Sequence, residues 1–126
     1  MSDVVVTVPK NFQFRGKRGL AAWISEGDAV GEPWSGEDWY FFLGGYPPKK
    51  IKPGERVYVV YNGKLRGYSP LVRIEENPRP GYALVRRGDA VAVTIDELIK
   101  GFRGFRYRWW DREIEKSFPE WTSEAV

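Results

Sequence analysis

Residues 53–74 read PGERVYVVYNGKLRGYSPLVRI and carry the strongest local structural signal in the chain. Residues 57–61 are β-branched or aromatic, a composition that favours a strand. Asn62-Gly63 then lies between two apolar runs, and this pair tolerates the positive φ angles that a type I′ turn requires. We therefore expect a β-hairpin with a two-residue loop at Asn62-Gly63.

A two-residue loop also fixes how the two strands of this hairpin face each other. Because facing residues share one side of a sheet, the register places Tyr58, Val60 and Leu65 on the core side. The expected facing pairs are Tyr61 with Lys64, Val60 with Leu65, Val59 with Arg66, and Tyr58 with Gly67.

The second strand of the hairpin changes its inward parity along its length. Leu65 is odd-numbered and apolar, whereas the apolar Val72 and Ile74 are even-numbered and flank Arg73. Pro70 lies between them, and a proline has no N–H to donate to a neighbouring strand. A bulge or bend near Pro70 would shift the inward face by one residue. A long strand that bends in this way is typical of a small, closed or nearly closed β-barrel.

The composition limits which functions are possible. At 126 residues the chain is expected to form one domain over residues 1–126. It contains no cysteine and no histidine, which excludes disulfides, thiolate and imidazole ligands, and a serine–histidine relay. A metal site would need oxygen ligands alone, and no metal site or cofactor is predicted.

The apolar segments are short and no signal peptide is recognisable, so we expect a cytoplasmic protein without a membrane partner. The net charge is only +3, so any electrostatic attraction must come from local patches of cations. Aromatic residues make up 16% of the chain, and this abundance favours an exposed stacking surface besides the core. The sequence leaves the oligomeric state open.

Two short helices are expected among the strands. Residues 20–26 are helix formers followed by Gly27, a typical residue after a helix end. Thr94 and Glu97 have the spacing of a capping box, which predicts a helix over residues 94–100. The predicted fold is mainly β, of the α+β class: a small β-barrel with two or three short peripheral helices. The expected strands span residues 4–8, 39–43, 57–74, 82–86, 90–93 and 105–110.

This order of elements resembles the PUA-like superfamily, which includes PUA, ASCH, EVE and YTH domains. The resemblance rests on an early helix after the first strand, on a basic turn and apolar strand at residues 51–60 followed by a bent strand, and on a late helix before an aromatic closing strand. The chain is similar to bacterial members of that group over most of residues 4–110. The resemblance implies a PUA-like β-barrel that binds RNA or a modified base.

Some ASCH members are nucleases or amidohydrolases, and their signature is roughly Gly-x-Lys-x-x-Glu-x-Arg. Aligning that glycine with Gly16 puts Arg18 at the lysine position and Ala21 at the glutamate position. An alanine cannot act as an acid or a base. The resemblance therefore implies the fold and the class of ligand, and no catalytic site.

The closing strand is the first candidate for a binding surface. If residues 105–110 alternate as a strand, Arg106, Arg108 and Trp110 share one face and the other aromatics share the opposite face. Guanidinium groups meet phosphates and an exposed ring stacks on a base, which fits a nucleic-acid surface. The pattern also fits a half-buried strand with solvated arginines, and a strand with two faces allows both interpretations.

A second candidate lies before the first expected helix. Arg15, Lys17 and Arg18 form a basic cluster, and cations at a helix N-terminus attract phosphate. A solvated basic loop explains the same residues. Trp34 lies in a Pro-Trp-Ser-Gly loop and is a candidate for an exposed stacking ring, whereas Trp23 on the helix is expected in the core.

The acidic residues between positions 26 and 38 are the candidate for catalysis. Paired carboxylates can hold Mg²⁺ or act as acid and base. Their spacing matches no metal-binding loop, however, and indicates a solvated acidic loop. These residues are Glu26, Asp28, Glu32, Glu37 and Asp38.

Three hypotheses follow for the function. The first is a PUA-like domain that binds RNA, or a modified or exposed base, through a basic and aromatic surface without doing chemistry. The alternatives are a protein-interaction or small-molecule-binding module, and an ASCH-like nuclease or amidohydrolase. The predicted nucleic-acid-binding residues are Arg15, Lys17, Arg18, Trp34, Arg106, Arg108 and Trp110.

Overall fold

The structure of the 126-residue chain is a computed structural model. It describes residues 2–8, 13–14, 17–18, 36, 38–43, 47–76, 81–88 and 90–117. Within these residues the chain is mainly β, as predicted, with one 3-10 turn, η1 (Arg112–Ile114). The strands are β1 (Val4–Thr7), β2 (Gln13–Phe14), β3 (Lys17–Arg18), β4 (Asp38–Leu43), β5 (Arg56–Tyr61), β6 (Lys64–Glu76), β7 (Tyr82–Arg87), β8 (Val93–Thr94), β9 (Phe105–Tyr107) and β10 (Lys116–Ser117).

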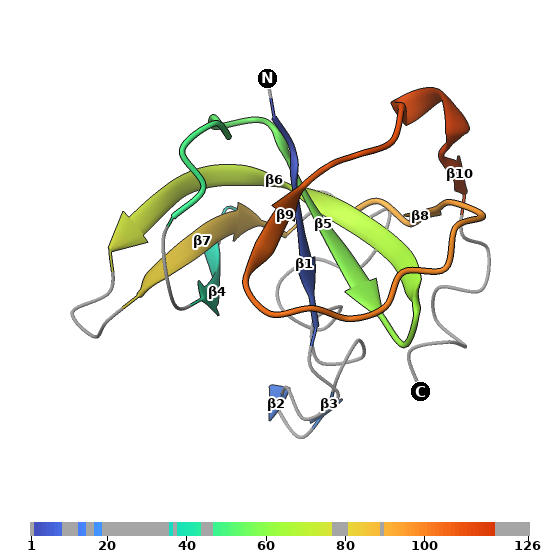
Figure 1. Ribbon diagram of the computed structural model, residues 1–126. Helices are drawn as coiled ribbons and strands as arrows, with labels where there is room; N and C mark the ends of the chain where they lie inside the picture. The colour runs from blue at the N-terminus through green and yellow to red at the C-terminus, as the bar shows by residue number, and fades with distance from the viewer. Residues whose placement is uncertain are drawn as a thin grey trace.

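Six of these strands form one mixed sheet in the order β4-β7-β6-β5-β1-β9. β1 runs parallel to β5, and the other neighbours in this sheet are antiparallel. Figure 1 shows β6 as a long, curved strand whose first half pairs with β5 and whose second half pairs with β7. The order runs openly from β4 to β9, and no pairing between these two strands closes a barrel among the described residues.

The hairpin at Asn62-Gly63 has the predicted turn. Asn62 has a φ of 51° and Gly63 a φ of 84°, as a type I′ turn requires. Tyr61 pairs with Lys64 and Val60 with Leu65, which confirms the predicted register next to the turn.

Beyond these two pairs the predicted register is wrong. Val59 pairs with Gly67 and Tyr58 with Tyr68, because the register shifts between Val59 and Val60. Arg66 is the extra residue that this β-bulge inserts into β6. The inward residues are nevertheless as predicted: Tyr58, Val60 and Leu65 are all fully buried.

A second register shift lies in β6, between Leu71 and Arg73, on the side that faces β7. It comes directly after Pro70 and confirms the predicted irregularity near that residue. Leu71 lies in the same hydrophobic cluster against which Ile74 packs, although the two have opposite parity. The shift therefore moves the inward face by one residue, as the sequence pattern indicated.

The central strands β1 and β5 are buried on both faces. Val4 and Val57 belong to one hydrophobic cluster, whereas Val5 and Tyr58 belong to a second cluster on the opposite face. Because each strand alternates its side chains between the two faces, a continuous apolar run is what such a position requires. The first cluster extends to Phe41 of β4, which places the edge strand on the core.

The helix predicted over residues 94–100 is absent, and this prediction is wrong. Thr94 belongs to β8, and residues 95–100 form no helix. The Ile99 amide donates to the Gly63 carbonyl of the hairpin at 2.8 Å, and the carboxylate of Glu97 accepts a hydrogen bond from the Trp109 indole instead of capping Thr94. Tertiary contacts have thus replaced the local ones.

The other helix, predicted at residues 20–26, lies outside the described residues. Among the helical segments that the structure describes, none has the length and apolarity needed to traverse a bilayer.

Candidate binding groove

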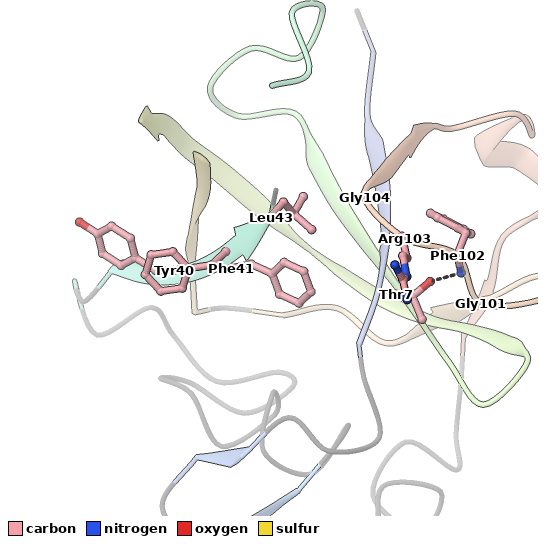
Figure 2. A pocket seen from close by; sticks show the side chains of 9 residues that line it. Thr7, Tyr40, Phe41, Leu43, Gly101, Phe102, Arg103 and Gly104 are labelled. Carbon is pink, nitrogen blue, oxygen red and sulfur yellow. Dashed lines mark hydrogen bonds between the residues drawn. The ribbon is translucent and has the colours of Figure 1, made fainter. Parts of the chain in front are cut away.

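A cavity of about 580 Å³ lies between the edge strand β4 and the loop that leads into β9. We call it the β4 groove. Residues 40–43 of β4 form one wall, and Thr7 at the end of β1 with the loop at residues 101–104 forms the other. Figure 2 shows the Phe41 and Leu43 side chains directed from β4 toward Thr7 and the loop, whereas the Tyr40 ring projects from the other face of β4.

The β4 wall is aromatic. Phe41 is buried in the core, whereas Tyr40 and Phe42 on the other face of the strand expose 37% and 63% of their surface. The rings of Tyr40 and Phe42 stack at 6.0 Å between centroids with an interplanar angle of 22°. Together they present a flat apolar surface beside the groove.

The loop wall is fixed to the end of β1. The Phe102 amide donates a hydrogen bond to Thr7 Oγ1 at 3.2 Å. A Cβ on Gly101 would come within 3.2 Å of the Thr7 side chain, so a larger residue at this position would crowd Thr7. Gly104 has a φ of 72°, a value that favours glycine, and it turns the chain into β9.

Two guanidinium groups lie at this wall. Arg103 is exposed at the lip of the groove. Arg106, also exposed, places its Cζ 4.4 Å from the centroid of the Phe102 ring, which is cation–π geometry. None of the described lining residues is acidic. The groove can therefore accept a flat, apolar group that carries a negative charge next to it.

Of the predicted binding residues that the structure describes, Arg106 is the one whose contacts reach the wall of the groove. Arg108 lies at the opposite end of β1, where its Nε donates to Asp3 Oδ2 at 2.9 Å and its guanidinium also contacts the Trp110 carbonyl. Arg108 is thus engaged in an ion pair away from the groove.

The predicted exposure of Trp110 is wrong. Trp110 is only 6% exposed and packs edge-on against Tyr58, with ring centroids 5.1 Å apart. Strand β9 ends at Tyr107, so the alternation expected over residues 105–110 stops before it reaches this residue. The neighbouring Trp109 is exposed instead, at 41%.

The structure gives less information on the other predicted nucleic-acid-binding residues. Arg15 and Trp34 lie outside the described residues. Lys17 and Arg18 form β3, which pairs with β2, so the loop expected here contains a small hairpin. Figure 1 draws this hairpin beyond the end of β1 at which Thr7 meets the groove.

Of the acidic stretch at positions 26–38, the structure describes Asp38 alone. Its carboxylate pairs with Arg73 NH1 at 3.0 Å. The described part of the chain contains no group of three or more acidic side chains arranged to hold a metal ion.

Two carboxylates anchor the segment at residues 108–117, which we call the clasp. Asp3 accepts hydrogen bonds from the Arg56 amide, from Arg108 and from Arg112. Glu115 accepts from Arg56 at 3.0 Å, from the Trp110 indole at 2.9 Å and from the Tyr58 hydroxyl. We call these residues the clasp network.

The electrostatics of the clasp network follow from burial and hydrogen bonding. Burial acts to raise the pKa of Asp3, but hydrogen bonds from the Arg56 amide and the Arg112 and Arg108 side chains hold that pKa below its usual value. Burial, and then the adjacent Glu115 carboxylate, raise the pKa of the Tyr58 hydroxyl, which therefore stays protonated. The clasp network is structural and does not face the β4 groove.

Sequence reasoning missed the groove residues Tyr40, Phe42, Phe102 and Arg103. One signal could have found the loop: Gly101 and Gly104 bracket a Phe-Arg pair, a pattern typical of an exposed turn that presents two side chains. No comparable signal marks the rings of β4, because residues 39–43 are all apolar.

Comparison of the chain with protein-family models, with curated proteins and with solved structures finds no match. The function is therefore inferred from the groove and its charges.

Proposed function

We propose that this protein is a PUA-like domain that binds single-stranded RNA, or another nucleic acid with an exposed or modified base, in the β4 groove. The observation that carries the proposal is the pair of exposed, stacked rings on β4 beside a groove whose other wall bears Arg103 and, on the Phe102 ring, Arg106. The mainly β architecture and the bent strand β6 agree with this proposal in outline.

The aromatic wall supplies attraction for a base. Tyr40 and Phe42 are exposed and already stacked on each other, so a third flat ring can add to the stack. Stacking of a base on an aromatic side chain contributes about 1–3 kcal/mol and tolerates any base. Phe42 is the more exposed of the two rings and would make the larger contact.

The loop wall supplies the charge. Arg103 is exposed and forms no ion pair with a described residue, so its guanidinium can reach a phosphate of the bound strand. Arg106 adds a second positive charge and makes a cation–π contact with the face of the Phe102 ring. The pairing of rings with cations favours a nucleic acid over an uncharged apolar ligand.

A protein-interaction module is the second candidate, and a different surface favours it. Leu98 and Trp109 expose 74% and 41% of their surface, and the Glu97 carboxylate accepts from the Trp109 indole at 3.1 Å. A carboxylate beside exposed apolar side chains repels phosphate and suits a protein partner. The two candidates use different residues, so substitutions can separate them.

The test is a salt titration of binding to a fluorescent pool of short single-stranded RNA. Phe42→Ala should weaken binding by about 1–3 kcal/mol and leave the salt dependence unchanged. Arg103→Gln should flatten the slope of log affinity against log salt by about 0.7, the contribution of one phosphate contact on a single strand. Fluorescence anisotropy measures both effects.

Matched controls come from outside the groove. Ile114→Ala removes an apolar side chain that is 52% exposed on η1, and Lys52→Gln removes an exposed cation. Both controls should bind as the wild type does. The proposal fails if the wild type does not bind at low salt, or if the controls weaken binding as much as the groove variants.

A further inference from the structure

The Tyr40 ring is exposed on an edge strand, yet its hydroxyl is held from two strands away. Arg73 of β6 donates from NH2 to Tyr40 Oη at 3.0 Å. β7 lies between β4 and β6 in the sheet order, so this side chain reaches across a whole strand to the wall of the groove. An exposed tyrosine without such a partner would exchange freely among its side-chain rotamers.

All three nitrogens of the Arg73 guanidinium are in use. Nε donates to Glu75 Oε1 at 2.7 Å, and NH1 donates to Asp38 Oδ2 at 3.0 Å, besides the bond to Tyr40. Tyr40 Oη also lies 3.5 Å from Glu75 Oε1. We call these four side chains the wall network. The planar fork of an arginine can join these three partners at once, and a lysine ammonium on a flexible stem cannot reproduce that geometry.

The register shift in β6 accounts for this position. It lies between Leu71 and Arg73, so Arg73 leaves the inward face and points to the outer face that β4, β6 and β7 share. Asp38 and Tyr40 have the same parity on β4, which puts both on that outer face. The bulge thus directs the Arg73 guanidinium toward Asp38 and Tyr40 on the edge strand β4.

Arg73 differs from Arg103 in what its charge can do. The Glu75 and Asp38 carboxylates hydrogen-bond to it and raise its pKa, so it stays charged and is neutralised in place. A cation held between two carboxylates is a poor phosphate ligand, because an approaching phosphate meets their negative charge. Any effect of Arg73 on ligand binding must therefore act through Tyr40.

We infer that Arg73 is a positioning residue for the β4 groove: it fixes the Tyr40 ring, and through the stack it fixes Phe42, in the orientation that a bound base meets. The inference rests on the proposed function and adds the residue that sets the affinity without touching the ligand. Fixing a contact side chain before binding spares the cost of ordering it on binding.

The experiment is a double-mutant cycle with two conservative changes. Arg73→Lys keeps the charge and loses the fork, and Tyr40→Phe keeps the ring and loses the hydroxyl. Each should weaken binding of the single-stranded RNA pool by about two- to tenfold, the range expected for ordering one or two side chains. The double variant should bind no more weakly than either single variant, and the salt slope should stay at the wild-type value.

Ring order in the free protein gives a second and independent readout. Aromatic ¹³C relaxation should show faster motion of the Tyr40 and Phe42 rings in Arg73→Lys than in the wild type. Wild-type affinity or unchanged ring order in Arg73→Lys would overturn the inference, as would multiplicative losses in the double variant. If the wild type binds no RNA while its rings are held, the proposed function fails and the role of Arg73 in binding fails with it.

Discussion

The clasp network and the wall network use the same chemistry in different surroundings. In the clasp network the Asp3 and Glu115 side chains are 1% and 6% exposed. In the wall network the Asp38 and Glu75 side chains are 27% and 40% exposed. Each network joins its carboxylates to arginines at distances near 3 Å, so burial is the main difference between them.

This difference decides what each network contributes. Breaking a buried pair leaves a charge without solvent, whereas an exposed pair exchanges its partner for water at little cost. The clasp network therefore stabilises the fold by holding residues 108–117 on β1 and β5, a segment that buries little apart from Trp110. The wall network has little effect on stability and orients two rings.

Asp3→Ala should give the largest change, because it removes the acceptor of two arginines and of the Arg56 amide at once. We expect a loss of about 3–5 kcal/mol in the free energy of unfolding. Urea denaturation measures it. Asp38→Ala is the matched change in the wall network and should cost no more than about 1 kcal/mol. Equal losses of unfolding free energy in the two variants would contradict the view that burial separates the clasp network from the wall network.

Glu115→Gln should give the next largest loss in the free energy of unfolding. A neutral amide accepts more weakly from Arg56 and the Trp110 indole, and hydrogen bonds to a charged group contribute about 1.5–3 kcal/mol. We expect a loss within that range, together with a change in the fluorescence of the buried Trp110. A variant as stable as the wild type would show that the clasp is held by packing alone.

Acid should remove part of this stability through Asp3. Its pKa is lower in the folded state than the usual 3.8, so the unfolded state binds the proton first as the pH falls. Its contribution is fully present above the usual pKa and is lost as the pH falls through the folded value. The stability gap between the wild type and Asp3→Asn should therefore narrow below pH 3.8, as urea titrations on either side of that pH would show. A gap that does not change with pH would contradict this account.

Glu75→Gln should have the smallest effect on stability. The pair of Glu75 with Arg73 is exposed on both sides, and such pairs contribute about 0–1 kcal/mol. We expect the unfolding free energy to fall by less than about 1 kcal/mol. A larger loss in thermal or urea denaturation would place the wall network among the elements that hold the fold together.

The sequence predicted the hairpin correctly near its turn because that signal is local. Asn62-Gly63 sets the backbone angles by itself, and the two nearest pairs follow from it. The shift that displaces Arg66 lies beyond the two pairs that the turn controls, and no turn or proline signal next to Arg66 marks it. The burial of the inward residues survived the shift because apolar side chains were available on both faces.

The groove and the clasp could not be predicted in the same way, since both join residues far apart in the chain. The Phe102 amide reaches Thr7 across 95 positions, and the Tyr58 hydroxyl reaches Glu115 across 57. Thr94 and Glu97 have the local pattern of a helix start, yet the contacts of Ile99 and Trp109 prevail. The strand pattern at residues 105–110 failed at Trp110 because the clasp begins where β9 ends.

Strand β1 occupies a place in the sheet that the chain can complete only late in its synthesis. Val4 pairs with Val57 in β5 and with Tyr107 in β9, so the ribosome adds about one hundred residues before the second neighbour exists. At about 5–20 residues per second this takes roughly 5–20 s. Protease digestion of ribosome-stalled chains would show when β1 becomes protected. Until then β1 has β5 alone beside it and the edge of its apolar run at residues 4–6 stays open, so chaperone binding and aggregation compete with its folding during those seconds.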